Sequence, residues 1–409
     1  MAASSSKPQH VLLAGATGSI GESSLSVLSE HPKRFQIFGL SAHKNAGKLY
    51  KLCVKYQPQH AVITCPSAFK DFHDLCTTGA RAWQGQAHCG PQVLAELAAC
   101  EEVDTLIAAI TGGAGLKSTF AAVQAGKRVL LANKEALVMA GSLMMDSACA
   151  SKAALLPVDS EHNAIFQSLP LAYHRDYGKA GDKDFQRYGI KKLLLTGSGG
   201  PFRERDRSNL IDVSPEEAVA HPNWSMGAKI SVDSATMANK GLELIEAMHL
   251  FGCSADEIDV IIHPQSIVHS MVQFTDGSVV SQMGEPDMRT PIAHCLAYPD
   301  RISSPVKPLD IISAKRLDFE APDYQRFPML AMARDVAGCC QSAMIAYNAA
   351  NEIAVERFLN AKAGFLDIDY IVSKVLDQHA TSELATIDDV LDLDQTIRAK
   401  ARAISCARS

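Results

Sequence analysis

Short apolar runs alternate with helical periodicity through the first 160 residues of the chain. Apolar runs that suit buried strands lie at 11–14, 35–42, 61–64, 104–110, 128–132 and 154–158. Helical patterns lie between some of them, near 92–100, 116–125 and 134–149. Because strands that alternate with helices pair in parallel, this part predicts an α/β, doubly wound parallel sheet.

The pattern changes after residue 190. Further strands are predicted at 191–196, 258–263, 268–274 and 278–284, and Asp276-Gly277 suits a hairpin turn between the last two. A proline-rich stretch follows, and then helical patterns at 329–336, 342–359, 368–379 and 387–404, the last with a capping box, Thr386-x-x-Asp389. We therefore expect a Rossmann-like first domain (1–159), an α+β central catalytic domain (160–297), a linker (298–328) and a C-terminal helical bundle (329–409).

Composition limits the class of protein. The chain has 409 residues, 47% of them hydrophobic, and a formal net charge of −6, which gives no basic surface for nucleic acid or an anionic membrane. No apolar run reaches the roughly 18 residues that a membrane helix needs. The eleven cysteines show no metal-binding or disulfide spacing, so we expect reduced thiols and a cytoplasmic location.

A glycine-rich turn follows the first predicted strand. Gly15, Gly18 and Gly21 lie between this strand and a helical pattern, the arrangement that holds a dinucleotide pyrophosphate at a helix N-terminus. Strands of this kind in NAD enzymes are followed by an acidic residue that binds the ribose. Here the second strand runs into His43, Lys44 and Asn45 without an acid, which favours NADP over NAD.

The stretch 221–243, HPNWSMGAKISVDSATMANKGLE, carries the densest polar chemistry. Its first six residues have no periodicity and suit a loop that folds over a polar ligand. Ser234 is predicted to cap a helix on which Asn239, Lys240 and Glu243 share one face. Such a face suits a phosphate, and the carboxylate beside it calls for a divalent cation. The alternative is a surface turn before an amphipathic helix with a simple Lys–Glu pair.

Polar residues also follow two strands of the first sheet. Asp159 and Glu161 come after the last strand, and on an extended chain they would point to the same side, as ligands for Mg²⁺ or Mn²⁺. Lys134 follows the preceding strand. A second glycine-rich turn, 197–202, contains Ser198 and could receive a phosphate.

Together these motifs resemble the 1-deoxy-D-xylulose 5-phosphate reductoisomerases, NADPH-dependent enzymes of the non-mevalonate isoprenoid pathway. The resemblance covers essentially the whole chain and rests on GATGSIG, LLANKE, PVDSEHNAIFQ, LTGSGGPF, HPNWSMGAKISVDSATMANKGLE and HPQSIVHSMV. It implies three domains, a homodimer, a sugar phosphate substrate, NADPH, and Mg²⁺ or Mn²⁺. The reaction it implies is rearrangement and reduction of 1-deoxy-D-xylulose 5-phosphate to 2-C-methyl-D-erythritol 4-phosphate.

The resemblance also implies the site residues. Catalysis would fall to Lys134, Glu161 and His221, and the metal ligands would be Asp159, Glu161 and Glu243. Substrate contacts would come from Ser160, Ser198, His221, Ser234, Asn239, Lys240 and Glu243, from Trp224 and Met226 in a mobile flap, and from Met288 nearby. NADPH would be held by Gly15, Thr17, Gly18, Ser19, Ile20, Gly21, His43, Lys44, Asn45, Asn133, Glu135 and Gly227, with His43 bulkier than the small residue often found there.

Two other functions start from the same residues. An NADP-dependent semialdehyde or sugar-phosphate dehydrogenase shares the glycine-rich turn, but a semialdehyde dehydrogenase needs a nucleophilic cysteine, and no cysteine here has a recognisable Cys–His setting. A non-catalytic sensor of NADP and sugar phosphate would have no need for three carboxylates.

Overall fold

The computed structural model describes residues 7–78, 82–177, 184–220, 224 and 226–406. Backbone proximity divides the chain into two compact units. Unit 1 contains Met1–Asn133, Asp146–Asp159 and Asp287–Val306, and unit 2 contains Lys134–Met145, Ser160–Pro286 and Lys307–Ser409. The finer division into a first domain, a central domain, a linker and a helical domain stays a prediction.

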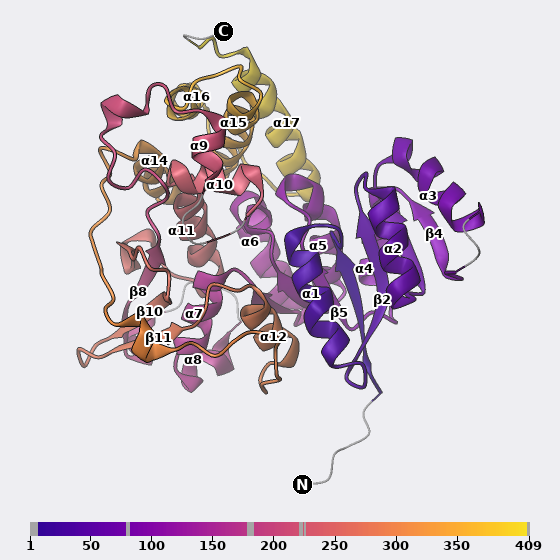
Figure 1. Cartoon of the computed structure of the whole chain (residues 1–409). Coiled ribbons are helices and arrows are strands. Elements are labelled where there is room, and N and C mark those ends of the chain that lie inside the picture. Colours follow the sequence, from indigo (N-terminus) through magenta and orange to yellow (C-terminus); the bar gives the residue numbers. More distant parts are fainter. Residues whose placement is uncertain (1–6, 79–81, 178–183, 221–223, 225, 407–409) are drawn as a thin grey trace. The chain divides into compact units, whose positions relative to one another are not determined.

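Unit 1 is built on a seven-stranded parallel sheet in the order β4-β3-β2-β1-β5-β6-β7 (Figure 1). Its middle strands are apolar on both faces because helices cover both faces. The predicted doubly wound sheet is confirmed. The strands are β1 Gln9–Ala14, β2 Phe35–Ala42, β3 His60–Ile63, β4 Gln86–Cys89, β5 Thr105–Ala108, β6 Arg128–Leu131 and β7 Ala154–Pro157.

The connecting helices form two layers. Right-handed crossovers put α1, α2 and α3 on one face and α4 and α5 on the other. In agreement, α2 packs on α3, α4 packs on α5, and α12 packs on α1. These helices are α1 Ser19–Glu30, α2 Ala46–Tyr56, α3 Pro66–Thr78, α4 Pro91–Ala99, α5 Leu116–Gln124 and α12 Arg289–Ala297; η1 Gly112–Gly115 precedes α5, and α6 Lys134–Ser151 belongs to both units.

The sequence pattern missed the edge strand β4 and the helix α3 before it. The four residues of β4, Gln-Ala-His-Cys, are all at least partly exposed, so they form neither an apolar run nor a clear alternation. Pairing with β3 determines this strand, and such tertiary context overrides local pattern.

The turn between β1 and α1 comes very close to the backbone that follows β5. Gly15 has a positive φ of 90°, and a Cβ atom on it would lie 2.4 Å from the carbonyl oxygen of Ala109. Glycine is therefore required here by conformation and by space.

Unit 2 contains a four-stranded mixed sheet in the order β11-β10-β8-β9. β10 is antiparallel to β8 and β11, and β8 is parallel to β9. The predicted hairpin is confirmed: Gly277 has a φ of 90°, and Asp276 Oδ1 accepts a hydrogen bond from Ser278 N at 2.9 Å. The strands are β8 Ile190–Gly197, β9 Ile258–Ile262, β10 Val268–Phe274 and β11 Val279–Met283, and α7 Ser160–Ser168 packs on β10 and β11.

The polar stretch was predicted to begin one helix, but it contains the start of two. They are α10 Ala228–Ala235 and α11 Ala238–Phe251. The predicted N-cap role of Ser234 is wrong, because Gly227 already caps α10 and Ser234 lies in its last turn. Met237, with a φ of 63°, breaks the helix and becomes the N-cap residue of α11.

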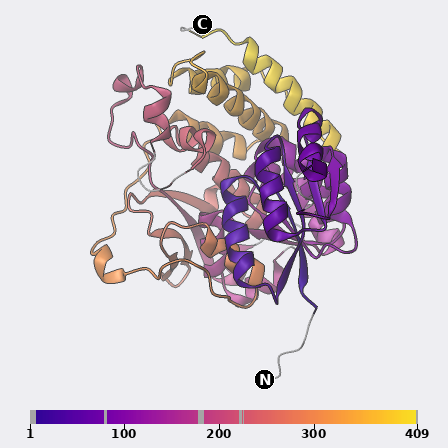
Figure 2. The same cartoon turned by 45° about the vertical axis from the view of Figure 1, so that its right-hand side comes forward.

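Helices from the end of the chain pack on these two. α14 packs on α11, and α15 packs on α10, α11, α16 and α17. Figures 1 and 2 show the C-terminal helices stacked together at one end of unit 2. Thr386 and Asp389 form the predicted capping box. These helices are α14 Pro328–Ala337, α15 Gln341–Leu359, α16 Asp367–Asp377 and α17 Ile387–Ala403.

Short elements complete the chain. They are α8 Leu171–Asp176, η2 Phe185–Tyr188, η3 Arg207–Leu210, α9 Pro215–Val219, η4 Ala255–Glu257 and α13 Ile311–Ala314. Among the helices within the described ranges, none combines the length and the apolar composition needed to cross a membrane.

Gly15→Ala should lower the free energy of unfolding by at least about 2 kcal/mol, since positive φ and a backbone clash each cost about 1–2 kcal/mol. Urea unfolding followed by circular dichroism measures this. Gly47→Ala is the matched control, because a Cβ on Gly47 in α2 meets nothing within 4 Å. It should be neutral or stabilising by up to about 1 kcal/mol. Equal stability of the two variants would contradict the tight turn.

Candidate active site

Three polar side chains lie together on the first turns of α11. Glu243 accepts hydrogen bonds from Asn239 Nδ2 and from Lys240 Nζ, one on each carboxylate oxygen. The i, i+4 and i, i+3 spacings predicted this common face, and the hydrogen bonds confirm it.

Lys240 also joins α11 to α7. Its Nζ donates to Glu161 Oε1 at 2.7 Å while it holds Glu243. Lys240 and Glu243 are buried and Glu161 is largely buried, so little water separates the charges. Two carboxylates from different helices therefore point at the same cation.

The predicted extended geometry of Asp159 and Glu161 is wrong. Asp159 lies in a bend after β7, and Glu161 lies in the first turn of α7, which begins at Ser160. The chain is not extended across the pair, so alternation does not orient the two side chains. Asp159 ends the segment Asp146–Asp159 of unit 1, and Glu161 follows it two residues later in unit 2.

A second lysine reaches the same carboxylate from α6. Lys134 is the first residue of that helix, and its Nζ donates to Asn239 Oδ1 at 2.9 Å and to Glu243 Oε1 at 3.0 Å. Lys134 and Glu243 are 109 positions apart along the chain, and the sequence pattern gave no sign of this contact. Both side chains are almost completely buried.

Burial and the lysines act in opposite directions on the charges of this cluster. Burial alone would raise the pKa of Glu161, but the ammonium groups of Lys240 and Lys134 lower it well below its ordinary value. Burial likewise opposes the charge of Lys240, yet Glu161 and Glu243 raise the pKa of that lysine. Both shifts therefore favour the charged forms of Glu161 and Lys240.

The second glycine-rich turn lies against α10 and α11. A Cβ atom on Gly200 would lie 2.5 Å from Ser234 O, and one on Gly197 would lie 2.7 Å from Lys240 Cε. The Ser198 hydroxyl accepts a hydrogen bond from Gly200 N at 3.2 Å. The absence of side chains thus lets this turn approach the residues predicted to bind phosphate.

His162 and Glu246 lie behind the carboxylates and were not singled out from the sequence. His162 Nε2 donates to the backbone carbonyl of Glu243 at 2.8 Å, and its Nδ1 lies 3.5 Å from Glu246 Oε2. Both side chains are fully buried. A signal was present, since Glu246 follows Glu243 by three residues and so lies on a neighbouring face of α11.

The predicted flap is described in part. Trp224 lies with its ring centroid 6.2 Å from that of His269 on β10, and Met226 precedes α10. His221 lies outside the described residues. Met288 directly precedes α12 in unit 1.

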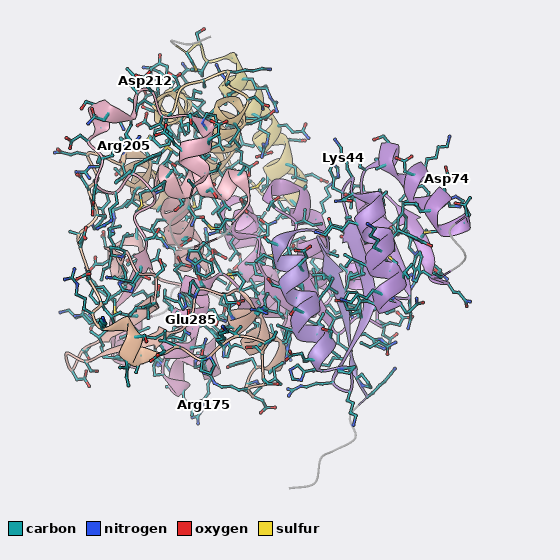
Figure 3. The ribbon with its side chains drawn as sticks, viewed as in Figure 1. Lys44, Asp74, Arg175, Arg205, Asp212 and Glu285 are labelled. Atoms are coloured by element: carbon teal, nitrogen blue, oxygen red, sulfur yellow. The ribbon has the colours of Figure 1, made fainter. Side chains whose placement is uncertain are left out.

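Most of the residues predicted to bind the dinucleotide lie in unit 1. Gly15–Gly18 form the turn after β1, and Ser19, Ile20 and Gly21 begin α1. His43, Lys44 and Asn45 form an exposed turn after β2, where Figure 3 labels Lys44. Asn45 Oδ1 caps α2 by accepting from Lys48 N at 3.1 Å. Asn133 Nδ2 donates to Gly112 O at 3.0 Å. Glu135 and Gly227 belong to unit 2.

A hard divalent cation fits the donors of unit 2. Carboxylate oxygens are the ligands that Mg²⁺ and Mn²⁺ prefer, and Glu161 and Glu243 already direct one oxygen each at the single positive charge of Lys240.

Sequence comparison decides the family. Residues 11–141 match the family described as 1-deoxy-D-xylulose 5-phosphate reductoisomerase, and residues 155–251 and 283–400 match two C-terminal domains of the same reductoisomerase. The chain belongs to the 1-deoxy-D-xylulose 5-phosphate reductoisomerase family. The predicted resemblance is confirmed.

Relatives of this reductoisomerase family match over almost their whole length. The 1-deoxy-D-xylulose 5-phosphate reductoisomerase of Pseudomonas fluorescens (strain Pf0-1) is 49% identical over 396 residues, which are 97% of this chain and 98% of that protein. The enzyme of the same name from Aromatoleum aromaticum is 50% identical over 400 residues, 98% of this chain and 97% of that protein.

Solved structures of the reductoisomerase family also match. One, of DOX-P reductoisomerase in complex with NADPH, fosmidomycin and magnesium, has a TM-score of 0.91 at 45% identity and covers 97% of this chain and 98% of its own. Another, of the Zymomonas mobilis enzyme with NADPH, has a TM-score of 0.86 at 43% identity, with coverage of 97% and 99%. Membership in this family favours a reductoisomerase over a semialdehyde dehydrogenase or a sensor.

Lys44→Ala should weaken the binding of NADPH far more than that of NADH, because Lys44 is the exposed cation in place of the acid that binds an NAD ribose. Titration of nicotinamide fluorescence gives both dissociation constants. Lys51→Ala, at an exposed lysine within α2, should change neither dissociation constant. Equal weakening of both cofactors by Lys44→Ala would mean that the 2′-phosphate is recognised elsewhere.

Proposed function

We propose that the chain catalyses the NADPH- and divalent-metal-dependent conversion of 1-deoxy-D-xylulose 5-phosphate to 2-C-methyl-D-erythritol 4-phosphate. Its family membership supports this, as do the related structures that contain NADPH and magnesium. The observation in the chain that carries the proposal is the buried cluster in which Lys240 and Lys134 meet Glu161 and Glu243.

We assign Asp159, Glu161 and Glu243 as ligands of Mg²⁺ or Mn²⁺. Glu161 and Glu243 converge in unit 2, and Asp159 is two residues from Glu161 along the chain. When bound, the metal supplies a Lewis acid for the ketone oxygen and its neighbouring hydroxyl, and NADPH supplies the hydride.

Lys134 is the group we assign to proton transfer or to neutralisation of developing charge. Its ammonium is buried and lies 3.0 Å from Glu243 Oε1, so its position is fixed by a residue of the metal site. A general acid must lie within hydrogen-bonding distance of its target, and this anchoring keeps the ammonium beside the reacting oxygens. Glu161 and His221 complete the catalytic set inferred from the family.

The phosphate of the substrate would be bound where α10, α11 and the second glycine-rich turn meet. The close approach of Gly200 to Ser234 and of Gly197 to Lys240 supports this assignment. The hydroxyl, amide and ammonium donors we assign to the substrate are Ser160, Ser198, Ser234, Asn239 and Lys240.

We also infer that the protein is a homodimer in the cytoplasm. β11 is an edge strand of the second sheet, and Val279 and Val280 on it are exposed. An apolar edge with unpaired backbone groups is a site for pairing with another strand. A second copy of the chain would cover this edge, and sedimentation measures the resulting mass.

An assay of NADPH oxidation with the ketose phosphate tests the proposed function. Turnover is expected with Mg²⁺ or Mn²⁺ and should vanish when a chelator removes the metal. Binding of both ligands without turnover would favour a sensor, and turnover that survives chelation would favour another NADP-dependent dehydrogenase.

Glu243→Gln should weaken metal binding and lower kcat by at least about a hundredfold, because each 1.36 kcal/mol of lost stabilisation is about tenfold in rate. NADPH binding should barely change. Calorimetric titrations of Mn²⁺ and NADPH measure both effects, and Glu204→Gln, at an exposed carboxylate, is the control. Normal Mn²⁺ binding and turnover in Glu243→Gln would remove the three carboxylates as the metal site.

Closure of the flap over bound ligand should change the fluorescence of Trp224, one of only two tryptophans in the chain. In a Trp83→Phe protein, fosmidomycin plus Mn²⁺ is expected to shift the emission as the indole loses contact with water. A Trp224→Phe protein, which retains the buried Trp83, should give no shift. An unchanged signal in the first protein, with full kcat/KM in Trp224→Ala, would exclude the flap role.

A further inference from the structure

The first two residues of α6 are held by two different helices. Lys134 donates to Asn239 and Glu243 of α11, as described above. Glu135, the next residue, accepts a hydrogen bond from Lys229 Nζ of α10 at 2.9 Å. α10 and α11 are the helices that the positive φ of Met237 separates, so the start of α6 is tied to both sides of that break.

Lys229 is shared between two buried carboxylates. Its Nζ lies 2.9 Å from Glu135 Oε1 and 2.8 Å from Asp233 Oδ2. The side chain of Lys229 is 32% exposed, whereas those of Glu135 and Asp233 are only 9% and 1% exposed. Because buried charges without a partner are costly, neither carboxylate can easily give up this cation.

The electrostatics agree with that geometry. Burial alone would lower the pKa of Lys229, but Asp233 and Glu135 raise it well above its ordinary value. Burial alone would raise the pKa of Glu135, and Lys229 reverses the effect and lowers it.

α10 is in turn anchored on the C-terminal helices. Asp233 Oδ1 accepts a hydrogen bond from Asn351 Nδ2 of α15 at 2.8 Å, and both side chains are buried. The adjacent Glu352 pairs with Arg398 of α17 at 2.5 Å. Lys229 therefore connects α10, which is held by α15 through Asp233 and Asn351, to the start of α6.

We propose that Lys229 is a positioning residue for the reductoisomerase reaction: it holds Glu135 in the orientation that binds NADPH. The inference rests on the proposed function and on the assignment of Glu135 to NADPH that the family resemblance implies. Lys229 acts through Glu135, and the anchor on Asp233 and Asn351 gives it a fixed base from which to do so.

The competing explanation is that the pair only stabilises the fold. NADPH affinity distinguishes the two, provided that stability is measured in parallel. We expect Lys229→Met to raise the dissociation constant for NADPH about tenfold and the KM for NADPH with it. Affinity for Mn²⁺ should stay within about twofold, because Lys240, Glu161 and Glu243 are unchanged. Lys229→Arg, which retains the charge, should recover most of the NADPH affinity.

A double variant separates positioning from stability. Lys229→Met leaves Asp233 buried without its cation and should lower Tm. Lys229→Met/Asp233→Asn removes the charge of Asp233 but leaves Glu135 without its cation, so Tm should rise part of the way while NADPH binding stays weak. Lys192→Met is the matched control, since Lys192 is 34% exposed and pairs with Asp259 on the second sheet. It should leave NADPH binding unchanged.

Parent-like NADPH affinity in Lys229→Met would overturn the inference. So would recovery of NADPH affinity together with Tm in the double variant, because stability would then explain both. Titration of NADPH fluorescence does not require turnover. A parent protein that binds NADPH but shows no turnover would therefore count against the proposed reaction. The NADPH affinities of the parent and the Lys229 variants could still be compared.

Discussion

The ammonium group of Lys240 lies between two carboxylates that belong to different helices, and much of unit 2 serves to bring them there. α7 supplies Glu161, and α11 supplies both Glu243 and Lys240. Bringing two carboxylates together in a buried place is unfavourable unless a cation lies between them. The packing of α7 on the second sheet and of α14 and α15 on α11 holds the two helices in one arrangement.

The same electrostatic requirement explains the positions of the other charged groups. Lys134 brings a second positive charge from the start of α6. Lys229 balances Glu135, the next residue of α6, and Asp233 on its own helix α10. Glu161, Glu243, Glu135 and Asp233 thus each have an ammonium within hydrogen-bonding distance. A region arranged in this way can exchange one cation for another without leaving a bare charge, which is what binding of a metal beside a phosphate demands.

Much of the architecture was predictable because local signals agreed with the fold. The strands of the first sheet are short apolar runs, and the spacing of Asn239, Lys240 and Glu243 gave their common face. The errors came where the local structure is determined by contacts with residues far away along the chain. The pattern could not reveal that α10 begins before Ser234 and includes it, that β4 pairs despite its polar residues, or that Lys134 meets Glu243. Asp159 and Glu161 looked like an extended pair because the start of α7 at Ser160 has no apolar signal of its own.

The break at Met237 has a consequence for how the length of this segment can vary. Successive residues of an α-helix are rotated by about 100° around its axis. Adding or removing one residue between Ala235 and Ala238 would therefore turn the whole face of α11 away from α7, even if every side chain of the cluster were retained. Loops elsewhere on the surface can lengthen at little cost. This two-residue link, Thr236 and Met237, sets the rotational phase of the site, and we expect its length to be among the least variable in the chain.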